Sequence, residues 1–393
     1  MEENFDLANL KDLISGELET HHQTLEELSL KIHSNPEMGL HEFKAVNWLT
    51  QHLKKHGFTI QNNICELPTA FRATYGQGDP AIALLAEYDA LPKLGHACGH
   101  NIIATSAIGA AVAAKKAINQ YGGSVIVIGT PAEELEGGKI KMAERGAFDN
   151  VDMTMLVHPG THNTATTRSL ACQTLKIEFT GKASHAAAKP EVGINALEAM
   201  ILSYNAINSL RQHIRADARI HGIITDGGEA ANIVPMHSAG TFQVRAEDIV
   251  YLENLKQRVL NCFIGAAKAS GARLEYSWEE TYAPMRNNLT MARLFQHNMQ
   301  SLGRNSKLFD PSKTFGSTDM GNISQIVPSI LPRVAIAPRG TSMHTPKFSN
   351  AAISADGLQG LMDASKALAM TVADVTSNLE TFNTITEELK GIG

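Results

Sequence analysis

Apolar side chains recur along the chain in two patterns, helical spacing and short unbroken runs. The first sixty residues follow helical spacing, as from Leu25 through Leu28 to Ile32, and an alanine-rich stretch predicts a helix over 101–118. Short apolar β-type runs predict strands at 71–75 and 81–86, and the runs at 124–128 and 151–157 predict fully buried strands. Helices that alternate with such strands indicate an α/β fold, with a mostly parallel sheet covered by helices on both faces.

The pattern changes in the middle of the chain. Over 174–180 apolar and polar residues alternate, which is typical of a half-exposed strand. The helices and strands that follow, up to about residue 281, give the order β-α-β-β-α-β of a ferredoxin-like α+β module. Beyond it the first pattern resumes, with a strand at 331–337 and a helix over 352–373. We therefore predict one α/β domain made of 1–171 and 284–393, and a second domain inserted at 172–283.

Composition narrows the range of functions. The 393 residues carry a net charge of −6 and no run of basic residues, which argues against nucleic-acid binding. The nearest approach to a membrane span, 102–114, is short and is interrupted by Thr105 and Ser106. The acidic N-terminal segment lacks the order of a signal peptide, and four scattered cysteines do not make a dense disulfide framework. We expect a cytoplasmic protein that binds neither nucleic acid nor membranes.

Candidate metal ligands occur in several separate segments. The sequence LGHACGHN at 94–101 places Cys98 and His100 two residues apart, where a thiolate and an imidazole can bind one divalent cation. Further candidate ligands follow at Glu133, Glu134, His158 and His344. One of two adjacent glutamates can bind metal while the other serves as the general base of a hydrolase. The set predicts a metallohydrolase.

These candidates follow the ends of predicted strands. Asp89 comes after 81–86, the two glutamates come after 124–128, and His158 comes after 151–157. Sites of open α/β sheets form at the carboxyl ends of the strands, so we expect these side chains to converge. Asp89 is better suited to orienting a ligand imidazole than to binding the metal itself.

Each residue also has an ordinary interpretation. A cysteine such as Cys98 is more often a small buried apolar residue, and paired glutamates usually lie on a solvated helix face. Because the chain has 16 histidines, His158 and His344 taken singly are compatible with hydrogen-bonded loop residues. His96 is compatible with a lining or supporting position. The combination, rather than any single residue, favours a metal centre.

Four segments carry a resemblance to a known family. They are LGHACGHN at 94–101, TPAEE at 130–134, GKASHAAAKP at 181–190 and GSTDMG at 316–321. In this order they resemble the aminoacylase/carboxypeptidase metallopeptidase family. The amidohydrolase branch is most similar, with aminobenzoyl-glutamate hydrolase, auxin-conjugate hydrolases and a β-alanyl-lysine-type dipeptidase. One departure is that Glu87-Tyr88-Asp89 stands where many relatives have a histidine-x-aspartate metal motif.

The resemblance implies a role for each matching residue. One or two divalent ions, zinc or manganese, would be bound by Cys98, His100, Glu134, His158 and His344. Glu133 would be the general base. His185 would stabilise the oxyanion in the partner's active site of a homodimer formed through the inserted domain. Asn232 would line the same pocket, and Arg245 would meet a substrate carboxylate or form a structural salt bridge.

The expected reaction is hydrolysis of an amide bond by metal-activated water. The substrate would be an N-acyl amino acid, an aminobenzoyl-glutamate-like conjugate or a dipeptide, and the inserted domain would act as a lid. Two alternatives are a deacetylase of a small N-acetylated amine and a non-catalytic protein that binds an amino-acid conjugate. A redox role for Cys98 is disfavoured, because no second cysteine lies nearby in the sequence.

Overall fold

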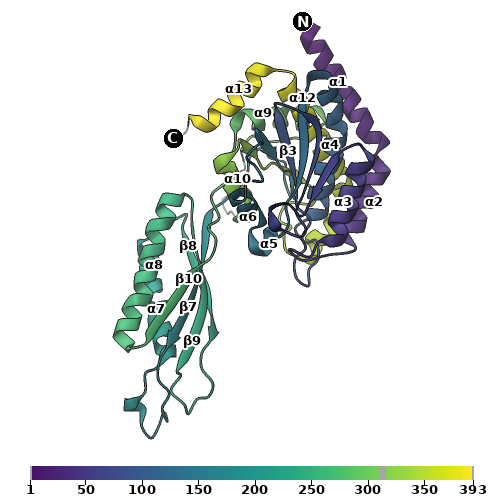
Figure 1. Cartoon of the computed structure of the whole chain (residues 1–393). Coiled ribbons are helices and arrows are strands. Elements are labelled where there is room, and N and C mark those ends of the chain that lie inside the picture. Colours follow the sequence, from purple (N-terminus) through teal and green to yellow (C-terminus); the bar gives the residue numbers. More distant parts are fainter. Residues whose placement is uncertain (1, 310–315, 392–393) are drawn as a thin grey trace. The chain divides into compact units, whose positions relative to one another are not determined.

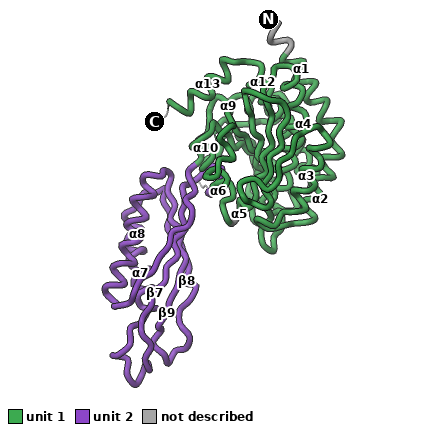
Figure 2. The backbone as a smooth tube through the Cα atoms, viewed as in Figure 1, with its two compact units in different colours: residues 1–168, 285–314, 322–393 green, residues 169–284, 315–321 purple. Residues whose placement is uncertain are grey.

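The computed structural model describes residues 2–309 and 316–391, and the chain divides into two compact units (Figure 2). Unit 1 is made of 1–168, 285–314 and 322–393, and unit 2 of 169–284 and 315–321. The sequence placed the insertion at 172–283 and assigned the segment ending at Gly321 to the other domain. Two hydrogen bonds between these segments account for this difference. Leu170 N donates to the Gly316 carbonyl at 2.8 Å, and Ser317 Oγ donates to the Leu170 carbonyl at 2.7 Å.

The helices and strands of unit 1 come from both sides of the insertion (Figure 1). The helices are α1 (Glu2–Thr20), α2 (His22–His33), α3 (Phe43–Lys55), α4 (His100–Tyr121), α5 (Glu133–Glu136), α6 (Gly138–Glu144), α9 (Leu289–Ser301), α10 (Met320–Ile326), α11 (Pro346–Ala351), α12 (Ala355–Thr376) and α13 (Leu379–Lys390), with a 3₁₀ turn at Ile64–Glu66. The strands are β1 (Thr59–Asn62), β2 (Phe71–Gln77), β3 (Ala81–Ala86), β4 (Gly123–Gly129), β5 (Met153–Met155), β6 (His158–Gly160), β11 (Ser329–Ile330) and β12 (Arg333–Ala335).

The main sheet has the strand order β1-β2-β4-β3-β5-β11. Strands β4, β3, β5 and β11 are parallel neighbours, whereas β2 is antiparallel to both β1 and β4. Every residue of β4 is buried, and successive residues face opposite sides, so both faces are covered at the centre of the sheet. The predicted fold class is confirmed. The predicted strand 151–157 is divided, because β5 ends at Met155 and His158 begins β6, which pairs with β12.

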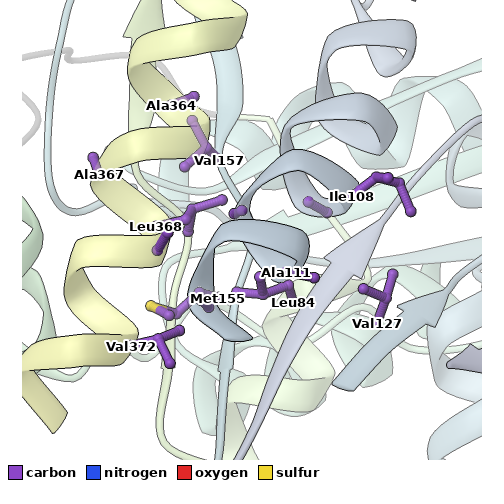
Figure 3. Packing of buried hydrophobic residues seen from close by; sticks show 14 of the residues in the cluster. Leu84, Ile108, Ala111, Val127, Met155, Val157, Ala364, Ala367, Leu368 and Val372 are labelled. Carbon is purple, nitrogen blue, oxygen red and sulfur yellow. The ribbon is translucent and has the colours of Figure 1, made fainter. Parts of the chain in front are cut away.

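Helices α4 and α12 pack together in the core of unit 1 (Figure 3). Ile108 and Ala111 of α4 lie in one buried cluster with Leu84 of β3 and Leu368 of α12. Helix α4 is longer than the apolar run at 102–114, and its length and composition would suffice for a membrane span. However, 89% of its most apolar window is buried in the protein, as in the core helix of an α/β domain.

Unit 2 has the predicted order of elements. They are β7 (Ala171–Thr180), α7 (Ala196–Leu210), β8 (Arg219–Asp226), β9 (His237–Ala246), α8 (Ile249–Ser270) and β10 (Arg273–Trp278), with 3₁₀ turns at Pro190–Val192 and Arg211–His213. The sheet is antiparallel in the order β10-β7-β9-β8. Along β7, Leu175 and Ile177 are buried while Lys176 and Glu178 are exposed. Helices α7 and α8 pack on the buried face, so the other face is left polar.

Candidate metal centre

Strands β3 and β4 bring acidic residues to one edge of the sheet. The two strands run parallel, with Ala86 paired to Gly129 at their carboxyl ends. Glu87 and Asp89 follow β3 directly, and α5 opens with Glu133 just beyond β4. Neighbouring parallel strands end at the same edge, which is where α/β proteins place their sites.

Gly99 gives the loop before α4 its shape. Its φ of +83° is left-handed, and a Cβ there would lie 2.5 Å from Pro159 Cγ, so a side chain does not fit. His100 is the first residue of α4. The tight turn at Gly99 brings Cys98 to the start of β6, where its Sγ lies 3.4 Å from His158 Nε2. His158 Nδ1 donates to the Pro159 carbonyl at 2.7 Å, which turns Nε2 toward the thiol.

Asp89 holds two candidate ligands at once. Its Oδ1 and its carbonyl oxygen each lie 2.9 Å from His100 Nδ1, and its Oδ2 accepts from Glu134 N at 3.0 Å. Burial alone would lower the pKa of His100, but the Asp89 carboxylate raises it well above its usual range. Asp89 thereby fixes the imidazole so that Nε2 faces the remaining candidate ligands.

The predicted ligands form two triads that share the sulfur of Cys98. In the first, the ligand atoms of Cys98, His100 and His158 lie within 4.8 Å of one another, and in the second those of Cys98, Glu134 and His344 do so. His344 Nε2 lies 3.5 Å from Glu134 Oε1. His344 N donates to the Ala97 carbonyl at 3.0 Å, which ties its loop to the segment that carries Cys98. Glu133 forms a third group with His100 and Glu134 within the same 4.8 Å.

The donor set fits a divalent cation. His100 Nε2 and Glu134 Oε1 are buried 3.8 Å apart, and neither finds a hydrogen-bond partner in the part of the chain that the structure describes. Burial raises the pKa of the Cys98 thiol to about 12 and lowers that of His158 to about 4. A cation entering here would displace the thiol proton, meet a neutral imidazole and satisfy the two unpaired atoms.

Two of the three residues predicted in the inserted domain lie together. The segment around His185 pairs with the segment around Asn232: His185 forms a β-bridge with Ile233, and Ala186 N donates to the Asn232 carbonyl at 3.0 Å. His185 Nδ1 accepts from the backbone N–H of Ala187 and Ala188, which leaves the proton of the neutral ring on Nε2.

Arg245 lies at the other end of the sheet of unit 2. It is the penultimate residue of β9, whereas Asn232 precedes His237 at the start of that strand. Arg245 is eight residue steps along the strand from His237, which corresponds to about 26 Å. Its guanidinium donates to Ser317 Oγ and Gln243 Oε1, at 3.0 and 2.9 Å. Its predicted role, toward a substrate carboxylate or in a structural salt bridge, stays a prediction.

Two buried charged residues beside the centre were not found from the sequence. Glu42 Oε1 accepts from Ala132 N at 3.0 Å, and Glu42 Oε2 accepts from Thr69 Oγ1 at 2.6 Å. Lys139 Nζ lies 2.6 Å from Glu87 Oε1, and both side chains are almost fully buried. Isolated charged residues carry no motif, so only their burial marks them.

The chain is similar in sequence to known proteins. Residues 83–369 match the sequence model of the peptidase family M20/M25/M40. The Xaa-Arg dipeptidase of Mus musculus is 37% identical over 391 residues, which cover 94% of this chain and 90% of that protein. One of the subunits of p-aminobenzoyl-glutamate hydrolase from Escherichia coli K12 is 34% identical over 314 residues, which cover 74% of this chain and 65% of that protein.

A solved structure has the same fold. The YXEP protein of Bacillus subtilis, described as a dinuclear metal binding peptidase of the M20 family, superposes with a TM-score of 0.72 at 21% identity. The match covers 92% of this chain and 99% of that chain. Together with the sequence matches, this likeness confirms the resemblance and the fold class predicted from the motifs.

Proposed function

Because this chain belongs to the peptidase family M20/M25/M40, we propose that it hydrolyses a dipeptide or an N-acyl amino acid at a centre where Cys98, His100, Glu134, His158 and His344 would hold one or two divalent cations. The broader class is shown by the family: the chain is a metal-dependent hydrolase of amide bonds. The observation that supports the finer proposal is the pair of ligand triads that share the Cys98 sulfur. Zinc or manganese would suit this set of sulfur, nitrogen and oxygen donors.

Different residues of the chain have different roles in the proposed reaction. When bound, the cations supply positive charge that polarises the substrate carbonyl and makes the attacking water more acidic. Glu133, close to both triads, accepts a proton from that water and returns it to the departing amine. Asp89 keeps His100 in the required orientation and also anchors the backbone of Glu134. In this proposal His185 and Asn232 act on the substrate from the inserted domain.

The names of the relatives indicate which substrates to try first. They are Xaa-Arg dipeptides and aminobenzoyl-glutamate, and a small N-acetylated amine is the alternative. Membership of a peptidase family favours an enzyme over the non-catalytic binding protein. The four cysteines are free thiols, which supports the proposal that the protein acts in the cytoplasm.

Unit 2 has features that support the proposed homodimer. Strand β8 is at the edge of its sheet, and Ile223 and Ile224 on it are exposed. Ile201 and Leu202 on α7 are exposed as well. An edge strand with exposed isoleucines is a surface on which a second copy can pair. The variant Ile223→Lys should change a dimer into a monomer in light scattering; an unchanged dimer would place the interface elsewhere.

A substrate panel on metal-free protein reloaded separately with zinc, manganese and cobalt tests the reaction. We expect hydrolysis with at least one metal, and a turnover reduced by roughly 10²- to 10⁴-fold in Glu133→Gln while the bound metal persists. Full activity of that variant would reject Glu133 as the base. Bound metal without turnover of any compound would favour the binding protein.

A further inference from the structure

A second pair of opposite charges lies beside the metal centre. Glu87 follows β3, and Lys139 is the second residue of α6. Their side chains are 2% and 0% exposed, with 2.6 Å between Glu87 Oε1 and Lys139 Nζ. The helix approaches closely because Gly138 precedes the lysine: a Cβ there would lie 1.8 Å from the Pro131 carbonyl oxygen. This close packing directs the long lysine side chain into the protein.

The two oxygens of Glu87 face different groups. Oε1 is held by Lys139, whereas Oε2 lies 3.5 Å from His100 Nε2. That nitrogen is the one that Asp89 leaves for a cation. The Lys139 ammonium, 2.6 Å from Oε1, is the cationic partner of this carboxylate, so the two groups form an ion pair inside the protein. One oxygen of Glu87 therefore presents negative charge to the position of a cation in the first triad.

Stability alone gives little reason to keep such a pair. Removing two charges from water is expensive, and a buried ion pair is often no more stabilising than apolar side chains of similar size. A buried carboxylate at a cation site has another effect, since each unit charge there changes the local potential strongly. An ammonium group bound to that carboxylate offsets its charge and fixes its direction.

We propose that Glu87 and Lys139 are a charge-setting pair of the metal centre, in which Lys139 orients Glu87 and limits how strongly its charge attracts cations. Both are positioning residues rather than catalytic ones. The proposal rests on the metal-dependent function argued above. It differs from a purely structural role in one respect: the two residues should change cation affinity in opposite directions.

The test is the dissociation constant of zinc, measured on the full chain by competition with a chromophoric chelator. Lys139→Met should bind zinc at least roughly tenfold more tightly, because the Glu87 charge is no longer offset. Glu87→Gln should bind zinc at least roughly tenfold more weakly, because the lysine charge then faces the cations. The double variant should return close to the wild-type value. Thermal unfolding of each metal-free variant reports any loss of folding separately.

Matched controls make the outcome decisive. Lys141, on the same helix, pairs with Glu136 at the surface, and Lys141→Met should leave zinc affinity unchanged. If Lys139→Met does not fold, the double variant should still bind zinc more tightly than Glu87→Gln. The proposal would be overturned if the double variant and Glu87→Gln bound zinc with equal affinity. It would also be overturned if both single variants bound zinc more weakly than wild type. Zinc binding that survives Cys98→Ala at wild-type affinity would instead reject the metal centre itself.

Discussion

The buried carboxyl of Glu42 gives a prediction about stability and pH. Glu42 is 0% exposed and accepts hydrogen bonds from Ala132 N and Thr69 Oγ1. Ala132 has a φ of +59°, which is unfavourable for a side chain other than glycine, and it immediately precedes Glu133. The variant Glu42→Ala leaves two buried donors without an acceptor, at about 1–3 kcal/mol each, so we expect a loss of roughly 2–6 kcal/mol.

Glu42→Gln keeps the shape of the side chain but cannot ionise. Burial raises the pKa of Glu42 from 4.5 to about 7. A carboxyl whose pKa is higher in the folded state stabilises the fold fully below pH 4.5, and this contribution is lost as the pH rises to about 7. A shift of this size corresponds to about 3 kcal/mol. Relative to wild type, Glu42→Gln should therefore gain up to about 3 kcal/mol in stability between pH 4.5 and pH 8.

Urea unfolding of the metal-free protein at several pH values measures this effect. Of the two tryptophans, Trp48 lies on α3 in unit 1 and Trp278 lies in unit 2, so a Trp278→Phe background reports unit 1 alone. The control is Glu37→Gln, because the Glu37 carboxylate accepts from the backbone of α3 at Lys44 and Ala45 but keeps Glu42 intact. Because Glu42 is unchanged in this control, the stabilisation from Glu42 that wild type loses between pH 4.5 and about 7 should be lost in the control as well. Parallel profiles for Glu42→Gln and wild type would refute the reasoning.

Two further changes probe the loop before α4 and the N-terminal helices. Gly99→Ala should weaken zinc binding at least roughly tenfold, because its Cβ would meet Pro159. The control is Gly122→Ala: Gly122 has a similar φ of +85°, but a Cβ there has open space, so this variant should bind zinc with wild-type affinity. Equal zinc affinities would show that Gly99 does not shape the site. Burial lowers the pKa of His52 to about 4, so its contribution to stability is lost as the pH falls from 6.5 toward 4. Between pH 7 and pH 5, the free energy of unfolding measured in urea should therefore decrease by about 2 kcal/mol less for His52→Leu than for wild type. An equal decrease in both proteins would contradict this.

The sequence was most informative where candidate site residues follow the ends of predicted strands. The ends of β3 and β4 follow from their apolar runs, and the parallel pairing of these strands brings Asp89 and Glu134 within hydrogen-bonding distance. The same reasoning placed His158 just after a strand, although the structure makes it the first residue of β6. The apolar pattern, together with the rule that sites form at the carboxyl ends of parallel strands, was thus sufficient to predict which of these segments meet.

The sequence could not distinguish a buried lysine from an exposed one. In the sequence of α6, Lys139 and Lys141 flank Ile140, and no sequence pattern distinguishes one lysine from the other. Their side chains are 0% and 29% exposed, because residues two apart point in nearly opposite directions from a helix. Which of the two directions faces the sheet depends on how α6 packs beside Pro131. This tertiary packing cannot be read from the sequence of the helix alone. Arg245 is a similar case, since its partners Gln243 and Ser317 follow from strand pairing and from a distant segment.

The carboxylates of the centre are anchored by separate elements of the chain. Asp89 is held by His100 at the start of α4, Glu87 by Lys139 from α6, and the backbone before Glu133 by Glu42 beside α3. These contacts are made between protein groups alone, so the folded chain itself contributes to holding the like charges together. A cation would displace the proton of the Cys98 thiol, whose pKa is raised by burial to about 12. In a centre built in this way, the neighbouring elements hold the carboxylates and the imidazole in their orientations.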